Sequence, residues 1–270
     1  RGDEVILGME AHSYRYEAGG VSVLGSIHPQ AILNRPDGTL DLGEVEAAIK
    51  PDDPHFPRTR LLALENTITG RVLSREYLAK AVDLAKRKNL SIHLDGARIF
   101  NAATALKMKV KDLCAGFDSV SSCLSKGLGA PAGTVLLGKK EFIQKARRAR
   151  KILGGGMRQA GVIAAAGLYA LENNVERLRT DHENAEKLAR GLREIGLEVQ
   201  LNTNMVLAKV SPQQAQQLGD FLKARQILVL PRSPMRLVTH LDVDAAGIDR
   251  TLGAFRSFFA PQAARATQAR

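Results

Sequence analysis

The stretch FDSVSSCLSKGLGAPAG, residues 117–133, joins a short strand to a glycine-rich turn that holds a single lysine. Its first part, FDSVSSC, is a short apolar segment with a β-branched residue, which predicts a buried strand. Lys126 follows directly, between Ser125 and Gly127. A lysine at such a place is either an ordinary solvated loop residue or a nucleophile toward carbonyl groups, because a free amine attacks carbonyls.

The segments around this stretch indicate an α/β fold. The sequence SREYLAKAVDLAKRKN, residues 74–89, has a serine cap and apolar residues at helical spacing. LSIHLDGARIF, residues 90–100, then predicts a strand followed by a turn into a helix. GTVLLG, residues 133–138, is a further short apolar segment. Alternating strands and helices predict a mainly parallel sheet with crossover helices.

The pattern changes after the triple glycine at 154–156. A helix of small residues is predicted over 157–174 and an amphipathic helix over 175–195. Three strands (MVLAKV, QILVLP and MRLVTHL) then alternate with two helices, which predicts a compact α/β module of about a hundred residues. We therefore expect a large domain over 1–172, a small C-terminal α/β domain over 173–259 and a disordered tail over 260–270.

Composition and charge exclude several classes of protein. The formal net charge is +11 over 270 residues, but the densest positive run, 139–152, predicts one helix. Elsewhere basic and acidic residues alternate along solvated helix faces, and no stacking or zinc-finger motif appears, so neither nucleic-acid binding nor a metal site is expected. No apolar run approaches the ~18–20 residues that span a bilayer. Cys114 and Cys123 form no disulfide framework and read as small core residues, so we expect a soluble protein of the reducing cytoplasm.

Asp95 and Lys126 point to one kind of chemistry. Asp95 closes the strand of LSIHLD, and Lys126 follows the next strand. Ligands of open α/β sheets bind at the carboxyl ends of strands, so both side chains should face one crevice. Pyridoxal phosphate needs such a pair, because a carboxylate keeps its pyridine nitrogen protonated and a lysine carries it as a Schiff base. The alternative for Asp95 is a helix N-cap.

The motifs HLDGARIFNA (93–102), CLSKGLGAPAG (123–133) and RKILGGGMRQAG (150–161) resemble those of the low-specificity L-threonine aldolases. MEAHSYRYEAGG (9–20) and RLVTHLD (236–242) match as well, in the order and spacing of that family. The resemblance extends from residue 1 to about 259. It implies the aspartate-aminotransferase-like fold, known as fold type I, and cleavage of L-threonine or L-allo-threonine to glycine and an aldehyde, in glycine synthesis and threonine breakdown.

The resemblance also implies a role for each matching residue. Lys126 would hold the cofactor, Asp95 would pair with its pyridine nitrogen, and His12 would stack on its ring and assist proton transfer. Arg98 and Arg236 would bind the substrate carboxylate, a task suited to planar bidentate donors. Lys151 and Arg158, which flank the triple glycine, would reach the cofactor phosphate of a neighbouring subunit. A homodimer or homotetramer is therefore expected.

Two departures from the family pattern leave other functions open. Ile68 in LENTITGRVLS occupies a position where family members often carry a second histidine. The family also has roughly seventy residues ahead of the equivalent of GDEVI, including a phosphate-gripping loop, so we expect that part to be missing here. A catalytically impaired homologue or fragment with a structural or binding role is thus the alternative. A basic binding module rests only on net charge, and a nicotinamide dehydrogenase lacks the GxGxxG signature.

Overall fold

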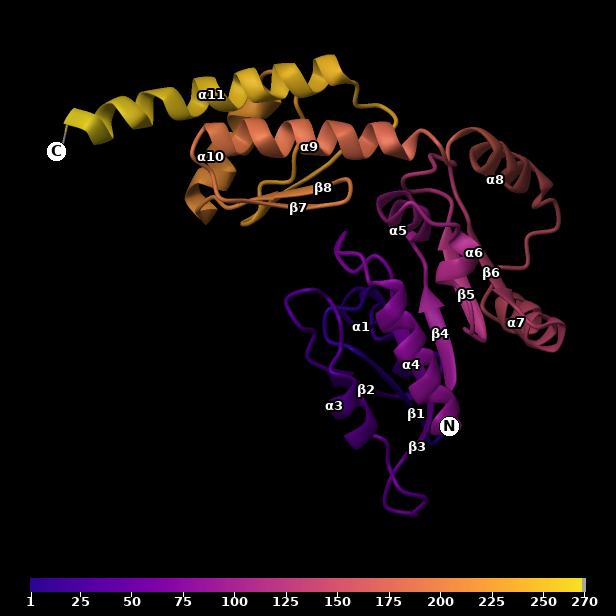
Figure 1. Ribbon diagram of the computed structural model, residues 1–270. Helices are drawn as coiled ribbons and strands as arrows, with labels where there is room; N and C mark the ends of the chain where they lie inside the picture. Colours follow the sequence, from indigo (N-terminus) through magenta and orange to yellow (C-terminus); the bar gives the residue numbers. More distant parts are fainter. Residues whose placement is uncertain (269–270) are drawn as a thin grey trace. The chain divides into compact units, whose positions relative to one another are not determined.

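The computed structural model describes the backbone of residues 1–268 and the side chains of residues 1–260. It divides into two compact units, Arg1–Val175 and Glu176–Arg270. Figure 1 shows the helices and strands of both units. Each unit is described separately below.

A six-stranded sheet forms the centre of the first unit, in the order β2-β1-β3-β4-β5-β6. Its strands are β1 (Asp3–Gly8), β2 (His28–Ile32), β3 (Arg58–Glu65), β4 (Ser91–Asp95), β5 (Ser119–Cys123) and β6 (Thr134–Gly138). The first five strands in that order pair in parallel, and β6 pairs with β5 antiparallel. The prediction of a mainly parallel sheet is confirmed.

Helices connect the first five strands along the chain, and two more follow β6. They are α1 (His12–Arg15), α2 (Gly20–Val23), α3 (Leu42–Ala47), α4 (Arg75–Arg87), α5 (Ile99–Leu106), α6 (Val110–Leu113), α7 (Lys140–Ile152) and α8 (Gly161–Asn173). The predicted helix at 74–89 is α4, and the hydroxyl of Ser74 caps it by accepting the Tyr77 main-chain N–H at 3.2 Å. Leu78, Val82 and Ala85 lie on its buried face, as their spacing predicts.

The two faces of the central sheet differ in polarity. On one face, Leu62 and Leu64 of β3 join Ile92 and Leu94 of β4 in the main core, which α4 also lines. Because successive side chains of a strand point to opposite faces, the other face carries the alternate residues. At the carboxyl ends of β3, β4 and β5 these are half-buried and largely polar. This polar end of the sheet is where a ligand site is expected.

The second unit is an antiparallel three-stranded sheet with three helices. Its elements are α9 (Leu178–Glu194), β7 (Val199–Asn202), β8 (Met205–Ala208), α10 (Pro212–Lys223), β9 (Met235–Val238) and α11 (Ala245–Gln268). In Figure 1, α9 and α11 run alongside each other over the β7–β8 hairpin. These elements form a compact unit with both helices and strands.

One predicted strand of this unit is wrong. QILVLP, 226–231, forms no strand, although Ile227 and Val229 pack against the core. The sheet of this unit contains only β7, β8 and β9 among the described residues, and residues 226–230 instead line a cavity of about 500 Å³ together with β9. A short run of apolar residues is typical of a strand, but a strand also needs a hydrogen-bonding partner.

The C-terminal segment of the chain extends the last helix of the second unit. The expected disordered tail, 260–270, falls partly within α11 and partly on residues 269–270, which lie outside the described part of the chain. Within the described residues, no helix combines the length and the apolar character that crossing a membrane requires.

Candidate active site

Three polar side chains lie in one row across the carboxyl ends of adjacent strands. Glu65 of β3 is in register with Asp95 of β4, and Asp95 is in register with Ser121 of β5. The Ser121 hydroxyl lies 3.4 Å from Asp95 Oδ1, and the Ala97 main-chain N–H donates to the same oxygen at 3.0 Å. Asp95 thus ends its strand with one oxygen held by two donors.

The loop after β5 presents Lys126. Hydrogen bonds from Leu124 N to Gly133 O (2.9 Å) and from Gly129 N to Lys126 O (3.0 Å) hold the loop closed. Gly129 has a φ of 73°, a conformation that side chains disfavour, so a glycine suits the turn. The Lys126 side chain itself is exposed, and within the described residues its amine forms no hydrogen bond or ion pair. The amine is available to a ligand at this edge.

His12 begins α1, in the connection that follows β1. Its main-chain N–H donates to Glu65 Oε2 at 2.7 Å. Its half-exposed ring places Nδ1 2.7 Å from Glu17 Oε1 and packs against Tyr16 at a centroid distance of 5.2 Å. If Nδ1 donates its proton to Glu17, Nε2 of the neutral imidazole is the atom that can accept a hydrogen bond.

Glu65 lies near three predicted site residues, Asp95, His12 and Lys126, but was not itself predicted from the sequence. Burial raises the pKa of Glu65 to about 7, and its surroundings include Asp95, His12 and Lys126. The carboxyl group is thus close enough to all three for their charges to act on its protonation. A signal was available, because RTRLLALE ends an apolar segment on an acidic residue just before a turn, as LSIHLD does.

The predicted arginines occupy different units. Arg98 is half-buried at the start of α5, three residues after Asp95. Arg236 is an exposed residue of β9 and lines the cavity of the second unit. The first arginine therefore lies near the carboxyl edge of the sheet that Asp95 ends, and the roles of both arginines stay predictions.

The predicted phosphate-binding cations flank the triple glycine of the first unit. Lys151 lies in the last turn of α7, and its side chain folds over Gly156, where an added Cβ would lie 3.2 Å from Nζ. Arg158 is exposed in the segment that leads to α8. Both side chains are accessible, so the structure leaves them free to meet an anion.

Arg71 links the loops that follow β1, β2 and β3. Its guanidinium pairs with Glu10 in the loop after β1 and donates to the main-chain oxygens of Pro36 (3.0 Å) and Ile68 (3.2 Å). The Ile68 side chain is only 2% exposed and belongs to the main core. The position that the family resemblance associates with a histidine is therefore filled here by a packed aliphatic side chain.

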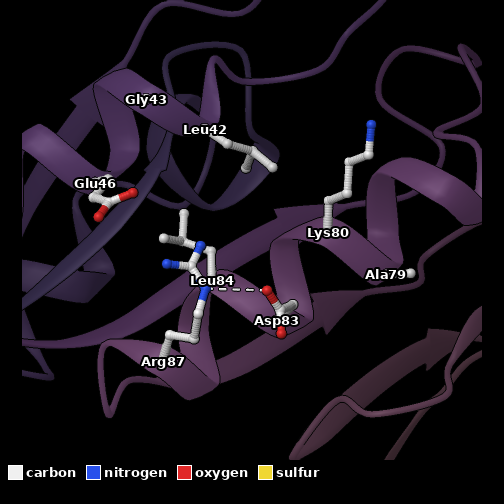
Figure 2. A pocket seen from close by; sticks show the side chains of 8 residues that line it. All are labelled: Leu42, Gly43, Glu46, Ala79, Lys80, Asp83, Leu84 and Arg87. Carbon is white, nitrogen blue, oxygen red and sulfur yellow. Dashed lines mark hydrogen bonds and ion pairs between the residues drawn. The ribbon is translucent and has the colours of Figure 1, made fainter.

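Two hollows of the first unit differ in their lining. A cavity of about 60 Å³ lies at the carboxyl edge and is lined in part by Ser13, Glu65, His93 and Asp95. A larger groove, drawn in Figure 2, lies between α3 and α4. Arg87 and Asp83 form an ion pair there at 3.1 Å, and no predicted site residue lines it. The carboxyl edge, rather than the larger groove, holds the candidate chemistry.

No cluster of metal-ligating side chains is found in the described part of the chain. The candidate site offers two carboxyl groups (Glu65 and Asp95), an imidazole (His12), a hydroxyl (Ser121) and an amine (Lys126). A carboxylate and a primary amine after adjacent parallel strands fit the pyridine nitrogen and the aldehyde carbon of pyridoxal phosphate, respectively.

Comparison with known proteins gives consistent matches. The family model described as beta-eliminating lyase matches residues 1–213. Over 261 residues the chain is 51% identical to the low specificity L-threonine aldolase of Escherichia coli O157:H7, which covers 96% of this chain and 78% of that protein.

Solved structures share the fold at lower identity. A Leishmania major threonine aldolase aligns with a TM-score of 0.80 at 18% identity, over 96% of this chain and 78% of that one. A serine palmitoyltransferase from S. paucimobilis, solved with pyridoxal phosphate and myriocin bound, aligns with a TM-score of 0.71 at 18% identity, over 96% and 66%. Both likenesses concern the fold, which is that of fold type I.

Proposed function

The chain belongs to the beta-eliminating lyase family, and within it to the low-specificity L-threonine aldolases, and on that basis we propose that it cleaves L-threonine and L-allo-threonine to glycine and acetaldehyde. The observation that carries this proposal is the placement of Asp95 and Lys126 after the neighbouring parallel strands β4 and β5. Other β-hydroxy-α-amino acids, such as β-phenylserine, would release the corresponding aldehyde.

Pyridoxal phosphate is the cofactor of this enzyme class, and the residues of the carboxyl edge fit it. When bound, it supplies an electron sink for the pair released as the Cα–Cβ bond of the substrate breaks. Lys126 would hold it through the exposed amine, and Asp95 would keep its pyridine nitrogen protonated. Asp95 suits this role because one of its oxygens is already held by Ala97 and Ser121.

His12 would act on the substrate hydroxyl. When Nδ1 donates to Glu17, Nε2 is an acceptor, so this atom can take the proton of the β-hydroxyl group as the carbonyl of the aldehyde forms. Ile68 offers no proton acceptor, which leaves His12 or a water molecule for this step. Arg98 and Arg236 would bind the substrate carboxylate as bidentate donors.

A self-associating chain would complete the site. Lys151 and Arg158 are accessible cations beside a glycine-rich turn and would bind the cofactor phosphate of a second copy. Exposed apolar side chains gather over the same part of the chain, among them Ile152, Leu153, Met157, Val162, Leu168 and Tyr169. Apolar groups exposed in such number favour a contact with another protein surface. We propose a homodimer or homotetramer, which sedimentation velocity would distinguish from a monomer.

An absorption spectrum tests the proposed function directly. Addition of pyridoxal phosphate to the purified chain should give a visible band from the covalently held cofactor, and Lys126→Ala should abolish it. Lys80→Ala is the matched control, because Lys80 is an exposed lysine in the α3–α4 groove. The unchanged protein should also release acetaldehyde from L-threonine. A band that survives in Lys126→Ala would remove that residue from the proposed site.

A further inference from the structure

We propose that Glu65 is a positioning residue of this site: its carboxyl group fixes His12 through the main chain and supplies a second acidic side chain beside Asp95. This inference rests on the proposed function, because Asp95 would hold the cofactor and His12 would move the substrate proton.

The contact between Glu65 and His12 replaces a missing helix cap. The residue that precedes α1 is Ala11, whose side chain offers no acceptor, and no side-chain cap is formed there. Glu65 Oε2 instead accepts the His12 N–H at 2.7 Å from a strand 53 positions away in sequence. The start of α1, and with it the imidazole of His12, is thereby tied to the end of β3.

The surroundings of Glu65 make its charge state relevant to the cofactor. Asp95 is its register partner on β4, His12 contacts it from α1, and Lys126 acts on it from the loop after β5. His93 of β4 lines the same small cavity. Burial raises the pKa of Glu65 to about 7, so the carboxyl group changes charge near neutral pH beside the acid that would hold the pyridine nitrogen.

Two substitutions separate the two roles. Glu65→Gln keeps an oxygen that can accept the His12 N–H but cannot ionise. Glu65→Ala removes both the acceptor and the charge. Asp41→Ala is the matched control, because Asp41 also accepts main-chain N–H groups at a helix start, those of Gly43 (2.7 Å) and Glu44 (3.3 Å) of α3.

The first readout needs no cofactor. In the unloaded protein, the His12 amide should exchange with solvent about fivefold faster in Glu65→Ala, as expected for a lost cap, and at the original rate in Glu65→Gln. The chemical shift of the same amide should change with an inflection near pH 7 in the unchanged protein, and that inflection should vanish in Glu65→Gln. An amide with unchanged exchange in Glu65→Ala would overturn the inference.

The second readout uses the protein loaded with pyridoxal phosphate. Its affinity and visible absorption should depend on pH near neutrality in the unchanged protein and in Asp41→Ala, but not in Glu65→Gln. Identical pH profiles in the unchanged protein and Glu65→Gln would overturn the second acidic role. Should the unchanged protein bind no cofactor at any pH, the proposed function fails, and the amide measurements still decide whether Glu65 positions His12.

Discussion

Replacement of Glu65 by glutamine should make the stability of the protein less sensitive to pH. Burial raises the pKa of this group from 4.5 to about 7, so the folded protein keeps a proton that the unfolded chain has already lost. The free energy of unfolding of the unchanged protein therefore falls as pH rises between these two values. One pKa unit corresponds to about 1.4 kcal/mol, which places the full cost of ionising Glu65 in the folded state at about 3 kcal/mol.

Urea unfolding followed by circular dichroism at pH 5, 6, 7 and 8 measures this effect. The free energy of unfolding of Glu65→Gln, minus that of the unchanged protein, should rise by about 2 to 3 kcal/mol from pH 5 to pH 8. Asp41→Asn is the control: hydrogen bonds from Gly43 and Glu44 lower the pKa of Asp41, so its titration lies below this range. Parallel stability curves for the unchanged protein and Glu65→Gln would refute the placement of a half-buried carboxyl group with a raised pKa at the end of β3.

Three further substitutions have defined outcomes. In Gly96→Ala, the new Cβ would lie 2.7 Å from the main-chain oxygen of Ser121. We therefore expect the free energy of unfolding in urea to fall by about 1 to 3 kcal/mol and cofactor binding to weaken. Unchanged stability and binding would contradict the close approach of β4 and β5. Ile68→His would bury an imidazole in the apolar core and should lower the free energy of unfolding by about 2 kcal/mol. An unchanged urea midpoint would show that the new side chain is not buried in the core. Thr239→Val removes the hydroxyl that donates to the Asp181 main-chain oxygen at 2.6 Å, which should cost about 1 kcal/mol, and a thermal midpoint equal to that of the unchanged protein would speak against this bond.

The parts of the site that lie on locally patterned segments could be predicted from the sequence. The strand that ends at Asp95 and the strand before Lys126 are short apolar segments followed by glycine turns, and both appear as β4 and β5. Their parallel pairing follows from the helices between them. Asp95 and Lys126 could therefore be assigned to one edge of a sheet from the sequence.

The position of Glu65 at the end of an apolar segment is visible in the sequence, but its contacts within the site are not. Its strand, β3, begins with Arg58 and Arg60 at alternate positions, so residues 58–60 lack the apolar side chains that indicate a buried strand. Its role depends on two neighbours: β4, which sets Asp95 beside it, and α1, whose N–H group it accepts. Contacts between segments so far apart in sequence leave no periodic signal.

The strand predicted over 226–231 was wrong for a different reason. Residues 227–230 form a continuous apolar run, but Leu228 and Leu230 are exposed, and no neighbouring strand pairs with the segment. A periodic pattern specifies which side chains are buried, whereas strand formation also requires a partner in register.

The register of β3, β4 and β5 also limits how this site can change through insertions and deletions. Asp95 shares a face with Glu65 and Ser121 because the strands pair residue by residue up to their ends. A single inserted or deleted residue inside β4 would turn Asp95 toward the side occupied by Ile92 and Leu94, where a carboxylate would enter the apolar layer. Descendants of this chain can vary the chemistry of the edge by substitution, or by lengthening the loops beyond it, but the lengths of its strands are held constant.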